Sequence, residues 1–128
     1  MKQKETHLVC GYGEIGKALA AILKADALDL ELNPPLTQYD VLHICFPYGK
    51  NFVKQVHAYQ KRFKPSLTII HATVPLETST KCMAVHSPIR GVHPDLERGI
   101  RTFVKYFGGP DAERAAEIFA ALKIPVIV

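Results

Sequence analysis

Apolar and polar residues alternate along the chain in blocks that predict strands and helices in turn. Thr6–Cys10 is an apolar run of strand length, and Lys17–Lys24 after it carries apolar residues at helical spacing. Ala27–Leu32 follows as a second predicted strand, with leucines on one side and polar residues on the other, and the prolines after Asn33 end it. Val41–Phe46 is a continuous apolar run, which is typical of a parallel strand covered on both faces.

The second half of the chain continues this alternation. The expected elements are a helix at Lys50–Phe63, a strand at Leu67–Ala72, a short helix at Glu77–Lys81, strands at Met83–Ser87 and Thr102–Phe107, a helix at Asp111–Leu122 and a strand at Pro125–Val128. This order predicts an α/β fold with a mostly parallel, doubly wound sheet and helices on both faces. Only Leu36–Asp40 separates the proline stop from the third strand, so we expect a reduced second crossover without a full helix.

A glycine-rich turn joins the first predicted strand directly to the first predicted helix. It reads Gly11-Tyr12-Gly13-Glu14-Ile15-Gly16, a GxGxxG pattern in the strand–turn–helix context of a dinucleotide-binding βαβ unit. Such a unit needs Gly11 for the tight turn, Gly13 for close approach of the pyrophosphate and Gly16 for helix–strand packing. The pyrophosphate would lie at the helix N-terminus, where free N–H groups and the helix dipole favour an anion. The alternative is a purely structural turn in some other α/β protein.

Composition narrows the class of protein. With 128 residues, 48% of them hydrophobic, the chain matches one domain spanning residues 1–128 with a buried core. The 16 Lys and Arg barely exceed the 12 Asp and Glu and are spread along the chain, which favours solvated helix faces over a nucleic-acid track. No apolar targeting segment opens the chain, and no run reaches the ~18 apolar residues of a membrane span. These features predict a cytoplasmic protein with neither a nucleic-acid nor a membrane partner.

Cysteine and histidine spacing gives no sign of a metal. The three cysteines form no CxxC pair, so we expect neither a disulfide framework nor a zinc site. The histidines lack HxH and HExxH spacing. They fall on separate predicted elements: His7, His43, His71 and His86 on strands, and His57 on a helix.

Four later segments, in order, strengthen a family resemblance that begins with the glycine turn. They are Asp40 with Val41–Pro47, His71–Pro75, Ser87–Gly91, and Gly99–Val104 leading to Gly108-Gly109. With Gly11–Gly16, the chain resembles the N-terminal NAD(P)-binding Rossmann domain of the 6-phosphogluconate and 3-hydroxyacid dehydrogenase superfamily, with some likeness to the UDP-glucose dehydrogenase branch. The resemblance implies a Rossmann fold, a dinucleotide cofactor and a small acid or sugar derivative as substrate.

The chain also departs from that family. Arg90 occupies the place of a serine that contacts substrate there. The family's catalytic lysine belongs to a helical domain with no counterpart before Val128. If the chain is complete, we expect cofactor binding without hydride transfer, unless a partner such as a second copy, paired through Pro125–Val128, closes the site.

The end of the second predicted strand bears on the choice of cofactor. An acidic residue about 20 positions after the first glycine binds the adenosine ribose of NAD, and Glu31 lies at that interval. Aligned on the family, Asn33 takes the strand end, where NADP enzymes often have Asn-Arg, but Pro34 follows and leaves no guanidinium for a 2′-phosphate. The sequence therefore favours NAD over NADP. The alternative interpretation of Glu31 is a solvent-facing strand residue.

Two further groups of residues are candidates for the site. Pro47, Tyr48, Thr73 and Val74 follow predicted strands, at the sheet edge where α/β folds bind ligands, although ordinary turn chemistry also accounts for them. Arg90 and His93 place a cation and a titratable imidazole on one loop, suited to hold a carboxylate or phosphate, as weak catalytic candidates. A surface loop in which Arg90 pairs with an acid is the simpler interpretation.

Two classes of function remain. One is the cofactor domain of an NAD(P)-dependent oxidoreductase, and the other is a non-catalytic module or sensor that binds NAD or another adenosine ligand such as S-adenosylmethionine. The fold alone does not choose between them.

Overall fold

A computed structural model describes residues 5–30, 32–75, 77–89, 100–101 and 104–128. Glu31, Arg90 and His93 therefore lie outside the described residues. The strands are β1 (His7–Cys10), β2 (Asp26–Leu28), β3 (Val41–Ile44), β4 (Leu67–Ile70), β5 (Val85–His86), β6 (Lys105–Tyr106) and β7 (Val126–Ile127). The helices are α1 (Glu14–Leu23), α2 (Phe52–Phe63), α3 (Thr78–Lys81) and α5 (Ala112–Ala120).

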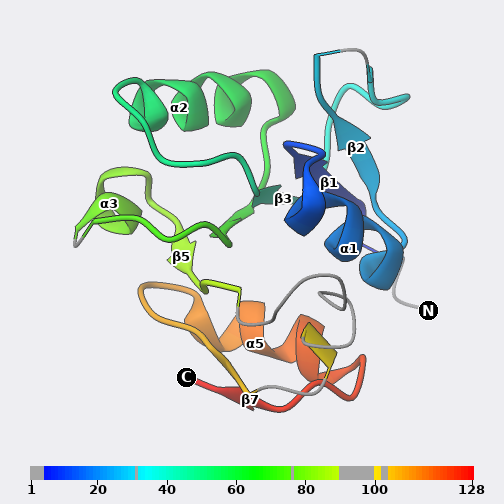
Figure 1. Cartoon of the computed structure of the whole chain (residues 1–128), viewed down its shortest axis with the longest axis vertical. Helices are drawn as coiled ribbons and strands as arrows, with labels where there is room; N and C mark the ends of the chain where they lie inside the picture. The colour runs from blue at the N-terminus through cyan, green and yellow to red at the C-terminus, as the bar shows by residue number, and fades with distance from the viewer. Residues whose placement is uncertain (1–4, 31, 76, 90–99, 102–103) are drawn as a thin grey trace.

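The main sheet has five parallel strands in the order β2-β1-β3-β4-β5 (Figure 1). The predicted α/β fold is confirmed, and its order reverses between β1 and β3, which makes their carboxyl ends a topological switch point. Between β2 and β3 the described residues contain no helix, as the short crossover predicts.

Helices cover both faces of this sheet. Leu19 of α1 and Phe119 of α5 belong to one buried cluster, together with Val9 and Ile69 of the sheet. The opposite cluster joins the alternate side chains of the same strands to the apolar side of α2, including Phe52, Val56 and Phe63. Figure 1 shows α2 and α3 on one side of the sheet and α1 and α5 on the other.

β6 and β7 form a separate two-stranded parallel sheet. Backbone N–H groups of His86 and Gly108 each donate to the other's carbonyl at 3.0 Å, which ties this small sheet to β5. Among the described residues, no helix is both long and apolar enough to cross a membrane.

The predicted second strand was wrong beyond Leu28. The Asp29 and Leu32 backbones bond to each other at 3.1 and 3.2 Å and close a tight turn. Leu30 is fully exposed, so the leucine alternation that suggested a longer strand does not mark a buried face.

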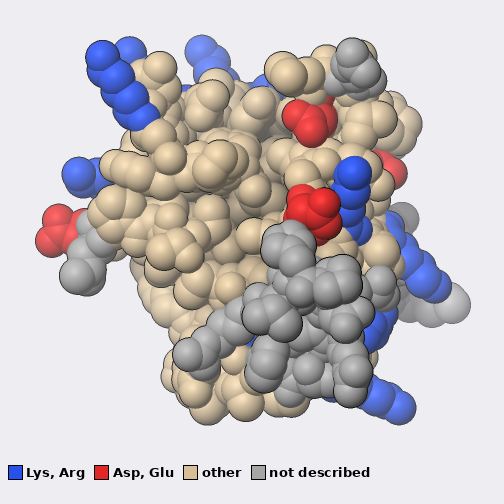
Figure 2. All heavy atoms as spheres, viewed as in Figure 1, with Lys and Arg blue, Asp and Glu red and all other residues tan. Residues whose placement is uncertain are grey.

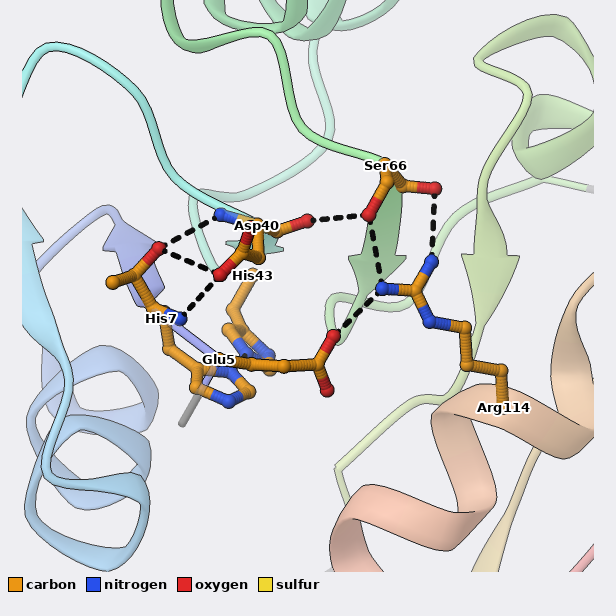
Figure 3. Close-up of polar contacts among 7 residues, drawn as sticks. Glu5, His7, Asp40, His43, Ser66 and Arg114 are labelled. Carbon is orange, nitrogen blue, oxygen red and sulfur yellow. Dashed lines mark hydrogen bonds and ion pairs between the residues drawn. The ribbon is translucent and has the colours of Figure 1, made fainter. Parts of the chain in front are cut away.

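Polar side chains tie the amino edge of the sheet together (Figure 3). Arg114 of α5 contacts Glu5 Oε2 at 2.7 Å and donates to Ser66 Oγ at 2.9 Å. Asp40 Oδ2 accepts the Thr6 N–H at 2.8 Å, which links the starts of β1 and β3. Asp40 therefore serves the amino edge, away from the glycine turn.

Candidate functional site

The first and third glycines of the turn are required by its packing. Gly11 has a φ of +99°, and a Cβ there would lie 2.8 Å from the Phe46 nitrogen. At Gly16 a Cβ would overlap the Gly11 carbonyl oxygen. Both positions hold α1 and β3 close to the end of β1, so they set the shape of the turn.

Gly13 differs from both, because a Cβ there would meet no atom within 4 Å. It is the N-cap residue of α1, its φ of −81° suits any residue, and no side chain caps the helix. The ten-residue helix therefore begins with its first N–H groups beside open space, the arrangement that favours an anion.

A hollow of about 500 Å³ lies on one side of this turn, at the ends of β1 and β2. We call it the first hollow. It is lined by Gly11, Leu28, Asp29, Leu30, Asn33, Phe46, Pro47, Gln55, Tyr59 and Arg62.

Asp29 is the acidic residue at the end of β2. β2 ends at Leu28, whose carbonyl accepts the Gly11 N–H at 2.9 Å, and Asp29 is the first residue beyond the strand. Asp29 Oδ2 accepts the Tyr12 N–H at 3.2 Å and fixes the carboxylate beside the glycine turn. The expected interval of about 20 residues after Gly11 is met by both Asp29 and Glu31, and from the sequence alone we expect Glu31. The observed end of β2 places Asp29 directly after the strand.

Arg62 brings a guanidinium to the first hollow from a distant part of the chain, whereas the expectation from the sequence concerns only the position beside Asn33. It comes from α2, 29 positions after Asn33 in the chain, yet both residues line the first hollow. Its guanidinium carbon lies 4.6 Å from the centre of the Phe63 ring. Sequence reasoning missed it because nothing in the local pattern of α2 indicates which helical residues face the end of β2.

A second hollow of about 440 Å³ lies on the other side of the turn. It is lined by Gly13, Glu14, Ile15, Cys45, Pro47, Tyr48, Ala72 and Thr73. Pro47 borders both hollows, so they are neighbours across the glycine turn and the end of β3.

The hollows collect most, but not all, of the predicted site residues that the structure describes. Tyr48 and Thr73 face the second hollow, and Asn33 faces the first. Val74 lines neither and packs against the α2 side of the core, and Tyr12 contributes its backbone N–H to Asp29.

The cysteine at the second hollow is not a thiolate at neutral pH. Burial, with a smaller contribution from Cys10, raises the pKa of the Cys45 thiol far above its usual value. Burial likewise raises the pKa of Cys10 to about 12. The thiols lack the lowered pKa that a nucleophilic cysteine needs.

In Figure 2 the Lys and Arg side chains of the described residues stand apart from one another, most of them near the margin of the visible face, and form no continuous track there. Within the described ranges, no group of three His, Cys, Asp or Glu side chains could hold a metal ion.

Three histidines that fall on separate strands in the sequence are neighbours across the sheet. His7 Nδ1 lies 2.9 Å from His43 Nε2, and His43 Nδ1 lies 2.9 Å from His71 Nε2. We call His7, His43 and His71 the histidine row. Burial lowers the pKa of both His43 and His71 well below the usual 6.5, and His7 and Lys105 lower that of His43 further.

We expect the free energy of unfolding to fall as the pH drops from about 6.5 to 5. The folded protein keeps His43 and His71 neutral while the unfolded chain binds protons there, so each ring contributes a slope of up to ~1.4 kcal/mol per pH unit. Urea unfolding at several pH values measures this slope. His43→Leu should flatten it and the exposed His57→Gln should not; an identical slope in all three proteins would contradict the expectation.

Comparison with known proteins supports the fold. No protein-family model and no curated protein matches the chain. Among solved structures, UDP-D-ManNAc dehydrogenase from Pyrococcus horikoshii superposes with a TM-score of 0.78 at 13% identity, over 95% of this chain and 46% of that one.

Two other structures are similar. Pyrroline carboxylate reductase from Plasmodium falciparum, solved with NADP bound, has a TM-score of 0.68 at 9% identity, over 97% of this chain and 57% of that one. Reductive aminase from Aspergillus terreus, solved with NADPH and ethyl levulinate, has a TM-score of 0.61 at 13% identity, over 97% and 53%. The chain spans about half the length of these proteins and has the Rossmann-like fold that they contain.

Proposed function

We propose that the chain binds an adenine dinucleotide across Gly11–Gly16 and is the cofactor half of an oxidoreductase like those of the 6-phosphogluconate and 3-hydroxyacid dehydrogenase superfamily. One observation carries the proposal: the glycine turn borders two neighbouring hollows, the first at Gly11 and the second at Gly13, which is bare and unobstructed at the start of α1. A dinucleotide has that form, with a pyrophosphate between two nucleosides.

The pyrophosphate would lie against Gly13 and the first turn of α1. The uncapped N–H groups of that turn and the positive end of the helix dipole stabilise its negative charge. A side chain at position 13 would take up the space that the phosphate needs, and glycine leaves that space open.

The adenosine would occupy the first hollow. Asp29, held by the Tyr12 N–H, presents a carboxylate to the ribose hydroxyls, and Asn33, Tyr59 and Arg62 offer further polar contacts. The Arg62 guanidinium lies over the Phe63 ring, and a guanidinium can also stack on a base.

The nicotinamide would occupy the second hollow, between the start of α1 and the ends of β3 and β4. Tyr48 and Thr73 supply hydroxyl groups there, and Ile15 and Ala72 supply an apolar surface. The hollow holds no thiolate, so its chemistry would be positioning of the ring and exclusion of water.

Parallel calorimetric titrations with NAD, NADP and S-adenosylmethionine test the proposal. We expect saturable binding of a dinucleotide. S-adenosylmethionine binding alone would favour the module without a redox role, because that ligand has no pyrophosphate to place at Gly13.

We expect NAD to bind at least ~10-fold more tightly than NADP, a difference of ~1.4 kcal/mol. A 2′-phosphate on the ribose would meet the Asp29 carboxylate, which lies at the end of β2. The titrations above measure the ratio, and Asp29→Asn should reduce it by removing the repulsion.

Arg62 provides the counter-test, because the two solved relatives named with NADP or NADPH leave that choice of cofactor open for this fold. If NADP binds as tightly as NAD and loses affinity selectively in Arg62→Met, then Arg62 clamps the 2′-phosphate and the preference for NAD is wrong.

A further inference from the structure

The histidine row crosses the face of the sheet that α1 and α5 cover. Its three rings are stacked, with centroids 5.1 Å apart at each step and interplanar angles of 28° and 19°. Both steps join the Nδ1 of one ring to the Nε2 of the next at 2.9 Å. Figure 3 shows the outer pair, His7 and His43, below the polar ties of the amino edge.

The row runs diagonally across β1, β3 and β4, from the amino ends of the strands toward their carboxyl ends. His43 pairs in register with Val9, so His7 lies two residues nearer the amino edge. His43 also pairs with Ile69, so His71 lies two residues nearer the carboxyl edge. His71 directly precedes Ala72 and Thr73, which line the second hollow. The row therefore leads from a half-buried ring to a buried one beneath the proposed cofactor edge.

Polar groups gather at the inner end of the row. Nδ1 of His71 and Oγ of Ser87 are buried and have no hydrogen-bond partner among the described residues. Lys105 Nζ donates to the Ser87 carbonyl at 2.7 Å and lies 5.3 Å from the centre of the Phe119 ring, which packs 5.7 Å from the His71 ring.

The titratable groups around this end come from several elements. Burial lowers the pKa of Lys105, on β6, to about 7, so the amine exists in both forms near neutrality. His86 of β5 bonds to the Ala72 carbonyl at 3.3 Å, and Cys45 after β3 stays a thiol. On α5 the neighbouring group is the uncharged Phe119 ring. Lys105 is therefore the basic group of this cluster, and its Nζ contacts the Ser87 carbonyl.

We propose that His7, His43 and His71 form a proton pathway that runs across the sheet from its amino edge to the buried polar cluster of Ser87 and Lys105. The pathway rests on the proposed function only for the source of its proton. If the second hollow holds the nicotinamide of NAD, oxidation of a substrate hydroxyl there would supply the proton that enters the row at His71.

The transfer conserves protons at every step. A proton that arrives at His71 Nδ1 lets His71 give up its Nε2 hydrogen to His43 Nδ1. His43 gives its Nε2 hydrogen to His7 Nδ1, and His7 gives up its own Nε2 hydrogen at the amino edge. Each ring ends neutral with its tautomer inverted, so one proton has crossed the sheet. The same steps in reverse carry a proton inward and restore the starting tautomers.

The pathway makes the tautomers of the three rings interdependent, and nitrogen NMR of the ligand-free 128-residue chain can detect this. We expect a scalar coupling across each N–H···N bond. We also expect the ring nitrogens of His43 and His71 to change with one shared pH midpoint. A His7 ring that holds two protons donates from Nδ1 to His43, which requires the hydrogens of His43 and His71 to lie on their Nδ1 atoms. Independent midpoints, or no coupling across either bond, would overturn the pathway.

Substitutions distinguish a coupled proton pathway from three histidines that are merely buried side by side. In His7→Leu, the His71 nitrogens should no longer respond to pH at the midpoint of His7. His57→Leu, which lies outside the row, should leave that response intact. His43→Leu removes the middle ring and serves as a second interruption if His7→Leu fails to fold. An unchanged His71 response in a folded interrupted variant contradicts the proposal.

NAD affinity, measured by calorimetry on the same proteins, keeps the two proposals distinct. None of the three rings lines either hollow, so the interrupted variants should bind NAD as the natural chain does. NAD binding without shared titration overturns the pathway alone. Shared titration without dinucleotide binding overturns the proposed function and leaves the pathway without its proton source.

Discussion

Gly16→Val should prevent the chain from folding. A Cβ at position 16 would overlap the Gly11 carbonyl oxygen and lie 2.9 Å from the Gly11 carbonyl carbon and 3.2 Å from Val9 Cγ1. Two of these atoms are backbone, so relief requires α1 to move away from β1, which would expose Leu19 and other buried residues of that cluster. We expect a loss above ~4 kcal/mol, a large part of the 5–15 kcal/mol typical of a domain.

Circular dichroism during thermal unfolding measures this effect. The natural chain should show one cooperative transition, and Gly16→Val should show none or one shifted to much lower temperature. Gly49→Val is the matched control, because a Cβ at Gly49 meets no atom within 4 Å. A Gly16→Val protein as stable as the Gly49→Val control would mean that α1 does not pack against β1 as described.

The arrangement of the main sheet was predictable because its strands are buried on both faces. Continuous apolar runs such as Val41–Phe46 stand out against helices with one apolar side, so element type and order follow from periodicity. The end of β2 could not be predicted in the same way. Leu30 and Leu32 alternate with polar residues as a strand would, but backbone bonds between Asp29 and Leu32 close a turn there. Hydrogen bonds of the local backbone end the strand here, and a hydrophobic pattern contains no information about such bonds.

The site was predictable where the residues are local and not where they converge from distant elements. The glycine turn is one contiguous motif, whereas Arg62 reaches the first hollow only through the packing of α2 beside the ends of β1 and β3. The histidine row depends on register: a shift of one residue between β1 and β3 would turn His7 and His43 to opposite faces. Neither the direction of a side chain nor the register between two strands can be deduced from the spacing of residues along the chain.

Gly13→Val should abolish dinucleotide binding in a chain that remains folded. The backbone at Gly13 has an ordinary φ and open space around its Cβ direction, so the substitution costs little stability. In the complex that space would hold the pyrophosphate, and the valine methyl groups would push it away from the helix N–H groups.

We expect at least a ~100-fold loss of NAD affinity from Gly13→Val, equivalent to ~2.7 kcal/mol, which calorimetry can measure beside a thermal unfolding curve. Gly49→Val again serves as the control, since Gly49 lines neither hollow and should bind NAD normally. The pair isolates ligand contact from folding, because both variants add the same side chain where the protein has room for it. If Gly13→Val is folded and its NAD affinity is unchanged, the pyrophosphate does not lie at the start of α1. The glycine turn would then have only the packing role that Gly11 and Gly16 already perform.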